Sequence, residues 1–231
     1  MPIFQPKVNL QGGLDYHVDI VMCIDVTGSM SPIIDEVKEK ALSLYPQFVA
    51  AMDEAGKSVQ KLRVKVIAFR DFGVDAEPMV ESRFFELDID EESAGFSEFV
   101  NGLEAIGGGD EPENALEALA LAMKSDWTRE GAVRRHVIIM YTDASAVPLG
   151  EMIGKDGYPA DMPASLAELQ DLWEGQGMEP RAKRILLFAP EADPWINMID
   201  WNQTFHTPSK AGTGCSEMDM DLCIKMLVKS I

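Results

Sequence analysis

The stretch His17-Val18-Asp19-Ile20-Val21-Met22-Cys23-Ile24 decides the fold, because it is a nearly continuous apolar run that ends at a single acidic residue, Asp25. Strands of a parallel sheet that helices cover on both faces carry runs of this kind. We therefore expect a central strand that is buried on both faces. Cys23 lies inside the run and is expected to act as a small buried hydrophobic residue.

A helix is predicted directly after this strand and a short loop. Ser31-Pro32 has the chemistry of an N-cap followed by a first helical residue. Gly56 is expected to end the helix. The apolar residues of the segment recur three and four positions apart, as they do on one helix face: Ile34, Val37, Ala41, Leu44 and Phe48.

Strands and helices go on alternating along the rest of the chain. Further strands are predicted at about 62–69, 83–87, 137–141, 184–188 and 204–206. Further helices are predicted at about 95–104, 115–123 and 163–173, after Asp193-Pro194, and near the end of the chain, where Ser216 would be the cap. Residues 146–162, rich in Gly and Pro, are expected to form a long loop.

This order predicts an α/β fold with a doubly wound, mainly parallel, Rossmann-like sheet and helices on both faces. Residues 1–15 are expected to be an N-terminal arm and residues 16–231 a single domain, since 231 residues suit one large domain. In such a sheet, ligands bind beyond the carboxyl ends of the strands. The residues that follow each strand are therefore the candidates for function.

Charge and cysteine content exclude several classes of function. Lys and Arg number 20 against 39 Asp and Glu, a formal net charge of −19. A chain this acidic is repelled by phosphate backbones and anionic lipid, so we expect neither nucleic-acid nor membrane binding. Three cysteines without a C-x-x-C pair form neither a disulfide framework nor a zinc knuckle. We see no signal peptide and expect a cytoplasmic protein.

Three oxygen-bearing side chains follow the first strand at alternate positions: Asp25, Thr27 and Ser29. In an extended or looping backbone, alternate side chains point to one side. One carboxylate and two hydroxyls are hard ligands that suit Mg²⁺ or Mn²⁺. A polar turn that caps the next helix is the alternative interpretation of the same residues.

Two more aspartates are expected at the same edge of the sheet. Asp143 ends the strand at 137–141, and Asp110 follows the triple glycine Gly107-Gly108-Gly109. Asp110 and Glu113 are also spaced as in a helix capping box, so Asp110 is either a ligand or a cap. Arg70-Asp71, after the second strand, either faces the site or forms an exposed ion pair.

These motifs resemble the von Willebrand factor A domain with a metal-ion-dependent adhesion site. Asp25-Val26-Thr27-Gly28-Ser29 matches its Asp-x-Ser-x-Ser pattern, with Thr27 keeping the hydroxyl of the first serine, and Thr142-Asp143 matches its third loop. Gly107-Gly108-Gly109-Asp110-Glu111-Pro112-Glu113 resembles a subgroup with Gly-Gly-Gly-Asp-x-Pro-Glu in the second loop. Ser145 stands where that subgroup often has proline.

The resemblance implies a protein-binding module that is not an enzyme. Its metal ligands would be Asp25, Thr27, Ser29, Asp110 and Asp143, holding Mg²⁺ or else Mn²⁺ or Ca²⁺. A partner protein would present an Asp or Glu to the cation, with Gly108, Gly109, Arg70 and Ser145 as contact residues. Two alternatives are a Mg²⁺-dependent phosphohydrolase of the haloacid-dehalogenase type and a structural scaffold with an empty metal site. The first alternative requires an acid–base aspartate where the sequence has Thr27.

Overall fold

The computed structural model describes residues 15–109, 111–175, 177–209, 224–225 and 228. Its centre is a seven-stranded sheet in the order β3-β2-β1-β5-β6-β7, with β4 also paired to β2. Pairings among β2, β1, β5, β6 and β7 are parallel, and β3 and β4 run antiparallel to β2. The strands are β1 (Asp15–Asp25), β2 (Ser58–Phe69), β3 (Met79–Glu81), β4 (Phe85–Glu86), β5 (Val133–Tyr141), β6 (Lys183–Pro190) and β7 (Thr204–Ser209).

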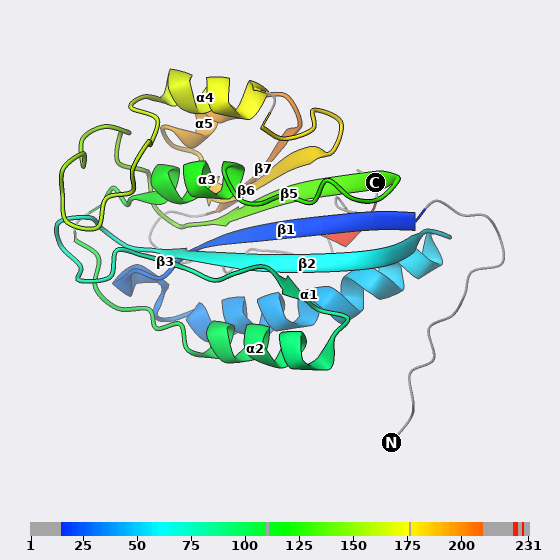
Figure 1. Cartoon of the computed structure of the whole chain (residues 1–231). Coiled ribbons are helices and arrows are strands. Elements are labelled where there is room, and N and C mark those ends of the chain that lie inside the picture. The colour runs from blue at the N-terminus through cyan, green and yellow to red at the C-terminus, as the bar shows by residue number, and fades with distance from the viewer. Residues whose placement is uncertain (1–14, 110, 176, 210–223, 226–227, 229–231) are drawn as a thin grey trace.

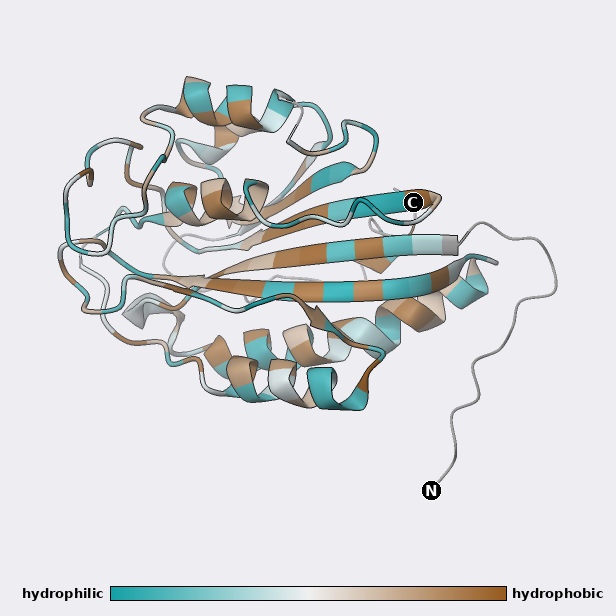
Figure 2. Cartoon of the chain, in the orientation of Figure 1, coloured by the Kyte–Doolittle hydropathy of each residue, from teal (hydrophilic) through white to brown (hydrophobic). Residues whose placement is uncertain are grey.

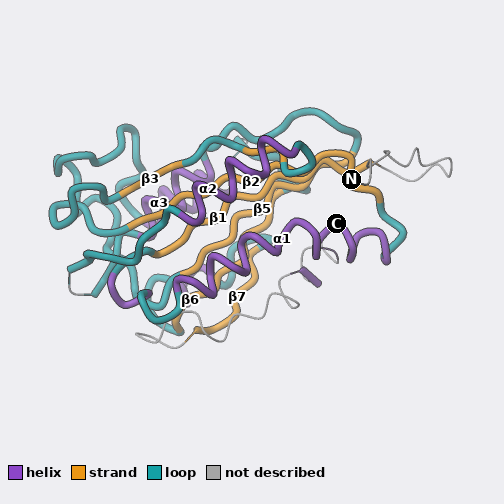
Figure 3. The backbone as a smooth tube through the Cα atoms, turned by 90° about the horizontal axis from the view of Figure 1, so that it is seen from below, coloured by secondary structure: helices purple, strands orange, loops and turns teal. Residues whose placement is uncertain are grey.

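Helices cover both faces of the sheet, as Figure 1 shows, with α1 and α2 on one face and α3, α4 and α5 on the other. This confirms the predicted doubly wound, mainly parallel α/β fold. Figure 3 shows the course of α1 along the sheet from below. Among the described helices, none is long and apolar enough to cross a bilayer. The helices are α1 (Ile34–Glu54), α2 (Asp90–Asn101), α3 (Ala115–Met123), α4 (Leu166–Glu174) and α5 (Trp195–Met198), with a 3₁₀ turn, η1 (Gly28–Met30), after β1.

The central strand β1 contributes to the two hydrophobic cores with alternate residues. Ile20 and Met22 lie in the core beneath α1 and α2, whereas Val21 and Cys23 lie in the core beneath α3, α4 and α5. Side chains of a strand alternate between faces, so a strand buried on both faces needs an unbroken apolar run. Figure 2 shows this apolar band toward the carboxyl ends of β1 and β2, with polar residues interspersed toward their amino ends.

One polar residue inside the apolar run is neutralised by an ion pair. Asp19 is 1% exposed. Its carboxylate accepts hydrogen bonds from Arg63 Nε at 2.8 Å and Nη2 at 2.6 Å, and from the backbone N–H of Thr128 at 2.6 Å. A bidentate guanidinium partner is the arrangement that best offsets the cost of burying a carboxylate.

Several predicted boundaries were wrong. Helix α1 begins at Ile34 without a side-chain cap, because the Ser31 hydroxyl donates instead to the carbonyl of Ala105 at 2.9 Å. Helix α2 begins at Asp90, five residues earlier than predicted, with acidic residues in its first turn. Strand β3 was not predicted at all. The prediction that Gly56 ends α1 is confirmed, since the helix closes at Glu54 and Gly56 has a φ of +69°.

Two predicted segments lie wholly or largely outside the described residues. The arm at 1–15 is described only at Asp15, which belongs to β1. The C-terminal helix with its cap at Ser216 falls in a stretch of which only residues 224, 225 and 228 are described.

Candidate metal centre

Three loops meet beyond the carboxyl ends of β1 and β5. We call residues 25–30 the first loop, residues 104–114 the second loop and residues 142–147 the third loop. Backbone hydrogen bonds join the first two loops, from Gly28 N to Gly107 O at 3.0 Å and from Ile106 N to Val26 O at 3.1 Å. The parallel pairing of β1 with β5 places the first and third loops at one edge of the sheet, as the sequence predicted.

Asp25 organises the first loop through its carboxylate. Its Oδ1 accepts from the backbone N–H of Thr27 at 2.9 Å and from the Thr27 hydroxyl at 2.6 Å. Its Oδ2 accepts from the Thr142 hydroxyl in the third loop at 2.8 Å. Asp25 is fully buried, so these three donors replace the water that the carboxylate loses on folding.

The Ser29 hydroxyl links the first loop to the third loop, which follows β5. Its hydroxyl donates to Asp143 Oδ1 at 3.0 Å and lies 3.2 Å from the hydroxyl of Thr27. Four of the five predicted metal ligands therefore lie together, namely Asp25, Thr27, Ser29 and Asp143. The fifth, Asp110, lies outside the described residues. Thr142, which binds Asp25, was missed by sequence reasoning, although its place beside Asp143 could have indicated it.

Burial raises the pKa of Asp25 from 3.8 to about 6, against the lowering effect of its hydrogen bonds from Thr27 and Thr142. The nearby Asp143 carboxylate raises the pKa further. A divalent cation would relieve both causes, because it neutralises buried negative charge. The two buried carboxylates and two hydroxyls, joined in a chain from Asp25 through Thr27 and Ser29 to Asp143, also form the hard oxygen set that Mg²⁺ prefers. The residues present therefore fit a divalent cation.

Hydroxyl oxygens are essential to that fit. Among the described residues, no group of three or more His, Cys, Asp or Glu side chains is arranged to hold a metal ion. The candidate centre would instead combine the Asp25 and Asp143 carboxylates with the Thr27 and Ser29 hydroxyls. Such a ligand set carries little negative charge and leaves the cation with coordination positions for water or a partner.

A second pair of buried carboxyl groups supports the second loop. Asp71 and Glu113 are 5% and 4% exposed. Burial raises the pKa of Glu113, and so do its hydrogen bond to Asp71 and the charges of Asp25 and Asp143. As carboxylates, both groups would have an oxygen without a donor, and one proton shared between the two carboxyl groups would supply that donor. Asp71 also accepts from the backbone N–H of Gly109 at 2.7 Å.

Glu113 does not cap α3, contrary to the capping-box alternative. Helix α3 begins at Ala115, with Asn114 at the N-cap position, so Glu113 precedes the helix. It joins the second loop to the third instead: its backbone N–H donates to Ser145 O at 3.0 Å, and its carbonyl accepts from Val147 N at 2.8 Å. The predicted contact residue Ser145 is half-buried at this junction.

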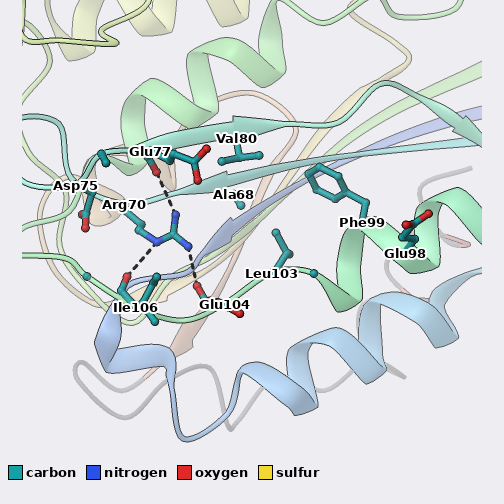
Figure 4. Close-up of a pocket in the computed structure, with 13 residues that line it drawn as sticks. Ala68, Arg70, Asp75, Glu77, Val80, Glu98, Phe99, Leu103, Glu104 and Ile106 are labelled. Carbon is teal, nitrogen blue, oxygen red and sulfur yellow. Dashed lines mark hydrogen bonds between the residues drawn. The ribbon is translucent and has the colours of Figure 1, made fainter.

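Arg70 holds three segments together through their backbone. Its Nε donates to the carbonyls of Val26 at 3.2 Å and Ile106 at 3.0 Å. Its Nη1 donates to Glu77 O at 3.1 Å, and its Nη2 donates to Glu104 O at 2.7 Å. Figure 4 shows the guanidinium between these segments. Arg70 therefore makes no ion pair with Asp71, and its predicted contact with a partner stays a prediction.

The glycines of the second loop permit a close approach to the first loop. Gly108 has a φ of +77°, and a Cβ added there would lie 2.9 Å from Thr27 Cβ. Gly109 has no such φ, and a Cβ there would meet its nearest neighbour, Asp71 Oδ2, at an ordinary 3.4 Å. Gly108 is half-buried and Gly109 is exposed. Contact of either glycine with a partner stays a prediction.

Gly108→Ala is expected to weaken cation binding and to lower stability by about 1–3 kcal/mol, because the backbone strain of a positive φ adds to the clash with Thr27. Gly109→Ala is the matched control and is expected to change both properties little. Urea unfolding with and without Mg²⁺ measures both effects. Equal tolerance of the two substitutions would contradict the packing of the second loop against Thr27.

Comparison with known proteins agrees with this fold. The family model described as von Willebrand factor A domain matches residues 19–148, more than half of the chain. The chain belongs to the von Willebrand factor A domain family. No curated protein matches the sequence significantly.

Solved structures show the same fold at low sequence identity. The pilus adhesin SpaC from Lactobacillus rhamnosus GG is similar with a TM-score of 0.60 and 13% identity, over 94% of this chain and 32% of that one. A von Willebrand factor type A protein from Catenulispora acidiphila is similar with a TM-score of 0.53 and 16% identity, over 92% of this chain and 43% of that one. The chain thus spans less than half the length of these proteins.

Proposed function

We propose that this protein is a metal-dependent protein-interaction module that binds a carboxylate of a partner protein through Mg²⁺ or Mn²⁺ at the edge of the sheet. Asp25, Thr27, Ser29, Asp143 and Asp110 would hold the cation. The observation that carries the proposal is the hydrogen bond between Ser29 and Asp143 at 3.0 Å, because it brings the first and third loops within the reach of one ion.

The exposure of these side chains suggests where a partner would approach. Asp25, Thr27 and Asp143 are buried, whereas Ser29 is exposed. Exposed apolar side chains lie in and beside the second loop, since Ile106 in the loop is 56% exposed and Val74 beside it is 64% exposed. Apolar side chains beside a polar centre are typical of a protein interface. A bound cation would supply the charge that lets an acidic partner group approach this acidic chain.

The arrangement disfavours the phosphohydrolase alternative. That chemistry needs an acid–base carboxyl two residues after the first aspartate, and Thr27 there donates its hydroxyl to Asp25. The scaffold alternative rests on the hydrogen bonds by which Asp25 holds the first and third loops, and it predicts no cation-dependent binding. We therefore propose a binding role without catalysis. A cytoplasmic location stays a prediction.

Affinity capture from native lysate tests the proposal with three arms: wild type with Mg²⁺, wild type with EDTA, and Asp143→Asn with Mg²⁺. We expect at least one protein to be retained by the first arm alone, because chelation and loss of the Asp143 charge both remove the cation that bridges the partner. Asp171→Asn serves as a control, since Asp171 is an exposed aspartate on α4, outside the three loops. If no protein were retained by the first arm alone, the metal-bridged mechanism would be contradicted.

A further inference from the structure

A hollow of about 470 Å³ lies beside the second loop, between β3 and the carboxyl end of α2. Its apolar lining includes Ala68, Val80, Phe99 and Leu103. Figure 4 shows the last three of these side chains around the hollow. Val80 and Phe99 are half-buried, so part of each remains in contact with solvent. We call this hollow the β3–α2 groove.

Carboxylates outnumber basic side chains around the β3–α2 groove. Glu77, Glu98 and Glu104 line it and are exposed. Among the described residues, no Lys or Arg side chain pairs with any of these three carboxylates. The carboxylate of Asp75 also lines the groove, but it accepts from the backbone N–H groups of Gly108 and Asp71.

Arg70 is the one basic side chain among the residues that line the groove. Its three nitrogen atoms donate to backbone carbonyls, including those of Glu77 and Glu104. The guanidinium is therefore occupied in holding the loops and is not presented to an incoming anion. The groove presents apolar surface and an excess of negative charge, with four carboxylates against one guanidinium, which is the complement of a cationic, apolar ligand.

We infer that the β3–α2 groove is a second docking site, for a partner segment that carries one bulky aliphatic side chain flanked by Lys or Arg. The aliphatic side chain would contact Val80, Phe99 and Leu103, and the basic side chains would pair with Glu77, Glu98 and Glu104. Phosphate-bearing partners and anionic lipid are repelled by these carboxylates. A second copy of this chain is disfavoured by its net charge of −19. The groove needs no metal ion.

Amide chemical shifts of the ¹⁵N-labelled 231-residue chain test this inference with three capped pentapeptides. The probe is Lys-Lys-Leu-Lys-Lys. Lys-Lys-Ser-Lys-Lys lacks the aliphatic side chain, and Glu-Glu-Leu-Glu-Glu reverses the charge. We expect only the first to shift the amides of Ala68, Val80 and Leu103 in a saturable way. Its binding should weaken as salt rises and should be the same in EDTA and in Mg²⁺.

The variant Glu98→Gln/Glu104→Gln should bind the probe roughly three- to ten-fold more weakly, because two exposed charge pairs are lost. The control Glu54→Gln/Glu130→Gln removes two exposed carboxylates that do not line the groove and should bind like the wild type. Three results would overturn the inference: shifts that map elsewhere, equal binding of the serine peptide, or no saturable shift. EDTA-insensitive binding also separates this site from the proposed metal centre.

Discussion

Asp25→Asn is expected to be more stable than the wild type without a divalent cation and to gain no stability when Mg²⁺ is added. Asparagine is nearly isosteric, so its side-chain oxygen can still accept from Thr27, and Thr142 can turn its hydroxyl to accept from the new amide. The substitution removes a fully buried charge whose pKa is raised to about 6 by burial. It also removes one of the two carboxylates, Asp25 and Asp143, that would hold the proposed cation.

The stability advantage of Asp25→Asn should depend on pH. A carboxyl group whose folded-state pKa is raised stabilises the fold while it is protonated, and this contribution is lost as pH rises through the folded-state value. The difference between variant and wild type should therefore be small below about pH 4 and grow through pH 6, to at most about 3 kcal/mol above it. Urea unfolding in EDTA across this pH range measures the difference.

Mg²⁺ should raise the stability of the wild type and leave that of Asp25→Asn unchanged. At ten times its dissociation constant, a cation stabilises the wild type by about 1.4 kcal/mol, which corresponds to roughly 3–5 °C in melting temperature for a chain of this size. Asp25→Asn should show no such shift. Asp171→Asn, which changes an exposed aspartate on α4, should behave like the wild type. An equal Mg²⁺ response in all three proteins would contradict the role of Asp25.

Arg70→Ala is expected to lower the free energy of unfolding by about 2–4 kcal/mol, because charge-assisted hydrogen bonds to four backbone carbonyls are lost together. Arg70→Lys should recover only part of this, since an ammonium group cannot reproduce the planar fork. The Mg²⁺ response should also weaken in Arg70→Ala, because Arg70 joins the first loop at Val26 to the second loop at Ile106.

Arg83→Ala is the matched control for this prediction. Arg83 pairs with Glu92 and lies over the ring of Phe85, and contacts of an exposed arginine of this kind contribute little to stability. Urea unfolding of the wild type and the three arginine variants makes the comparison. If Arg70→Ala were as stable as Arg83→Ala, the four carbonyl contacts would not be holding the loops.

The fold could be predicted from the sequence because its signals are local. The apolar runs of β1 and β5 and the three- and four-residue spacing on α1 follow directly from burial on one or two faces. The start of α1 could not be predicted in the same way. Ser31 has the chemistry of a cap, but its hydroxyl finds the Ala105 carbonyl in a distant loop, and a tertiary contact of this kind overrides a local preference.

Part of the candidate site could be predicted from the sequence, and part of it could not. Asp25, Thr27, Ser29 and Asp143 could be placed together because parallel strands end at one edge of the sheet. The position of Arg70 after β2 did not reveal its function, since its acceptors come from three separate segments. The contact between Asp71 and Glu113 likewise depends on how the second loop packs and has no signal in spacing.

Diffraction from crystals grown with Mn²⁺ tests the central claim most directly, because manganese scatters anomalously and identifies its own position. We predict one anomalous peak at the carboxyl edge of the sheet, within coordination distance of the Ser29 hydroxyl and beside Asp25 and Asp143, that is lost in Asp25→Asn crystals grown in the same way. Crystals with saturating Mn²⁺ that show no peak between the first and third loops, or an unchanged peak in Asp25→Asn, would contradict the account.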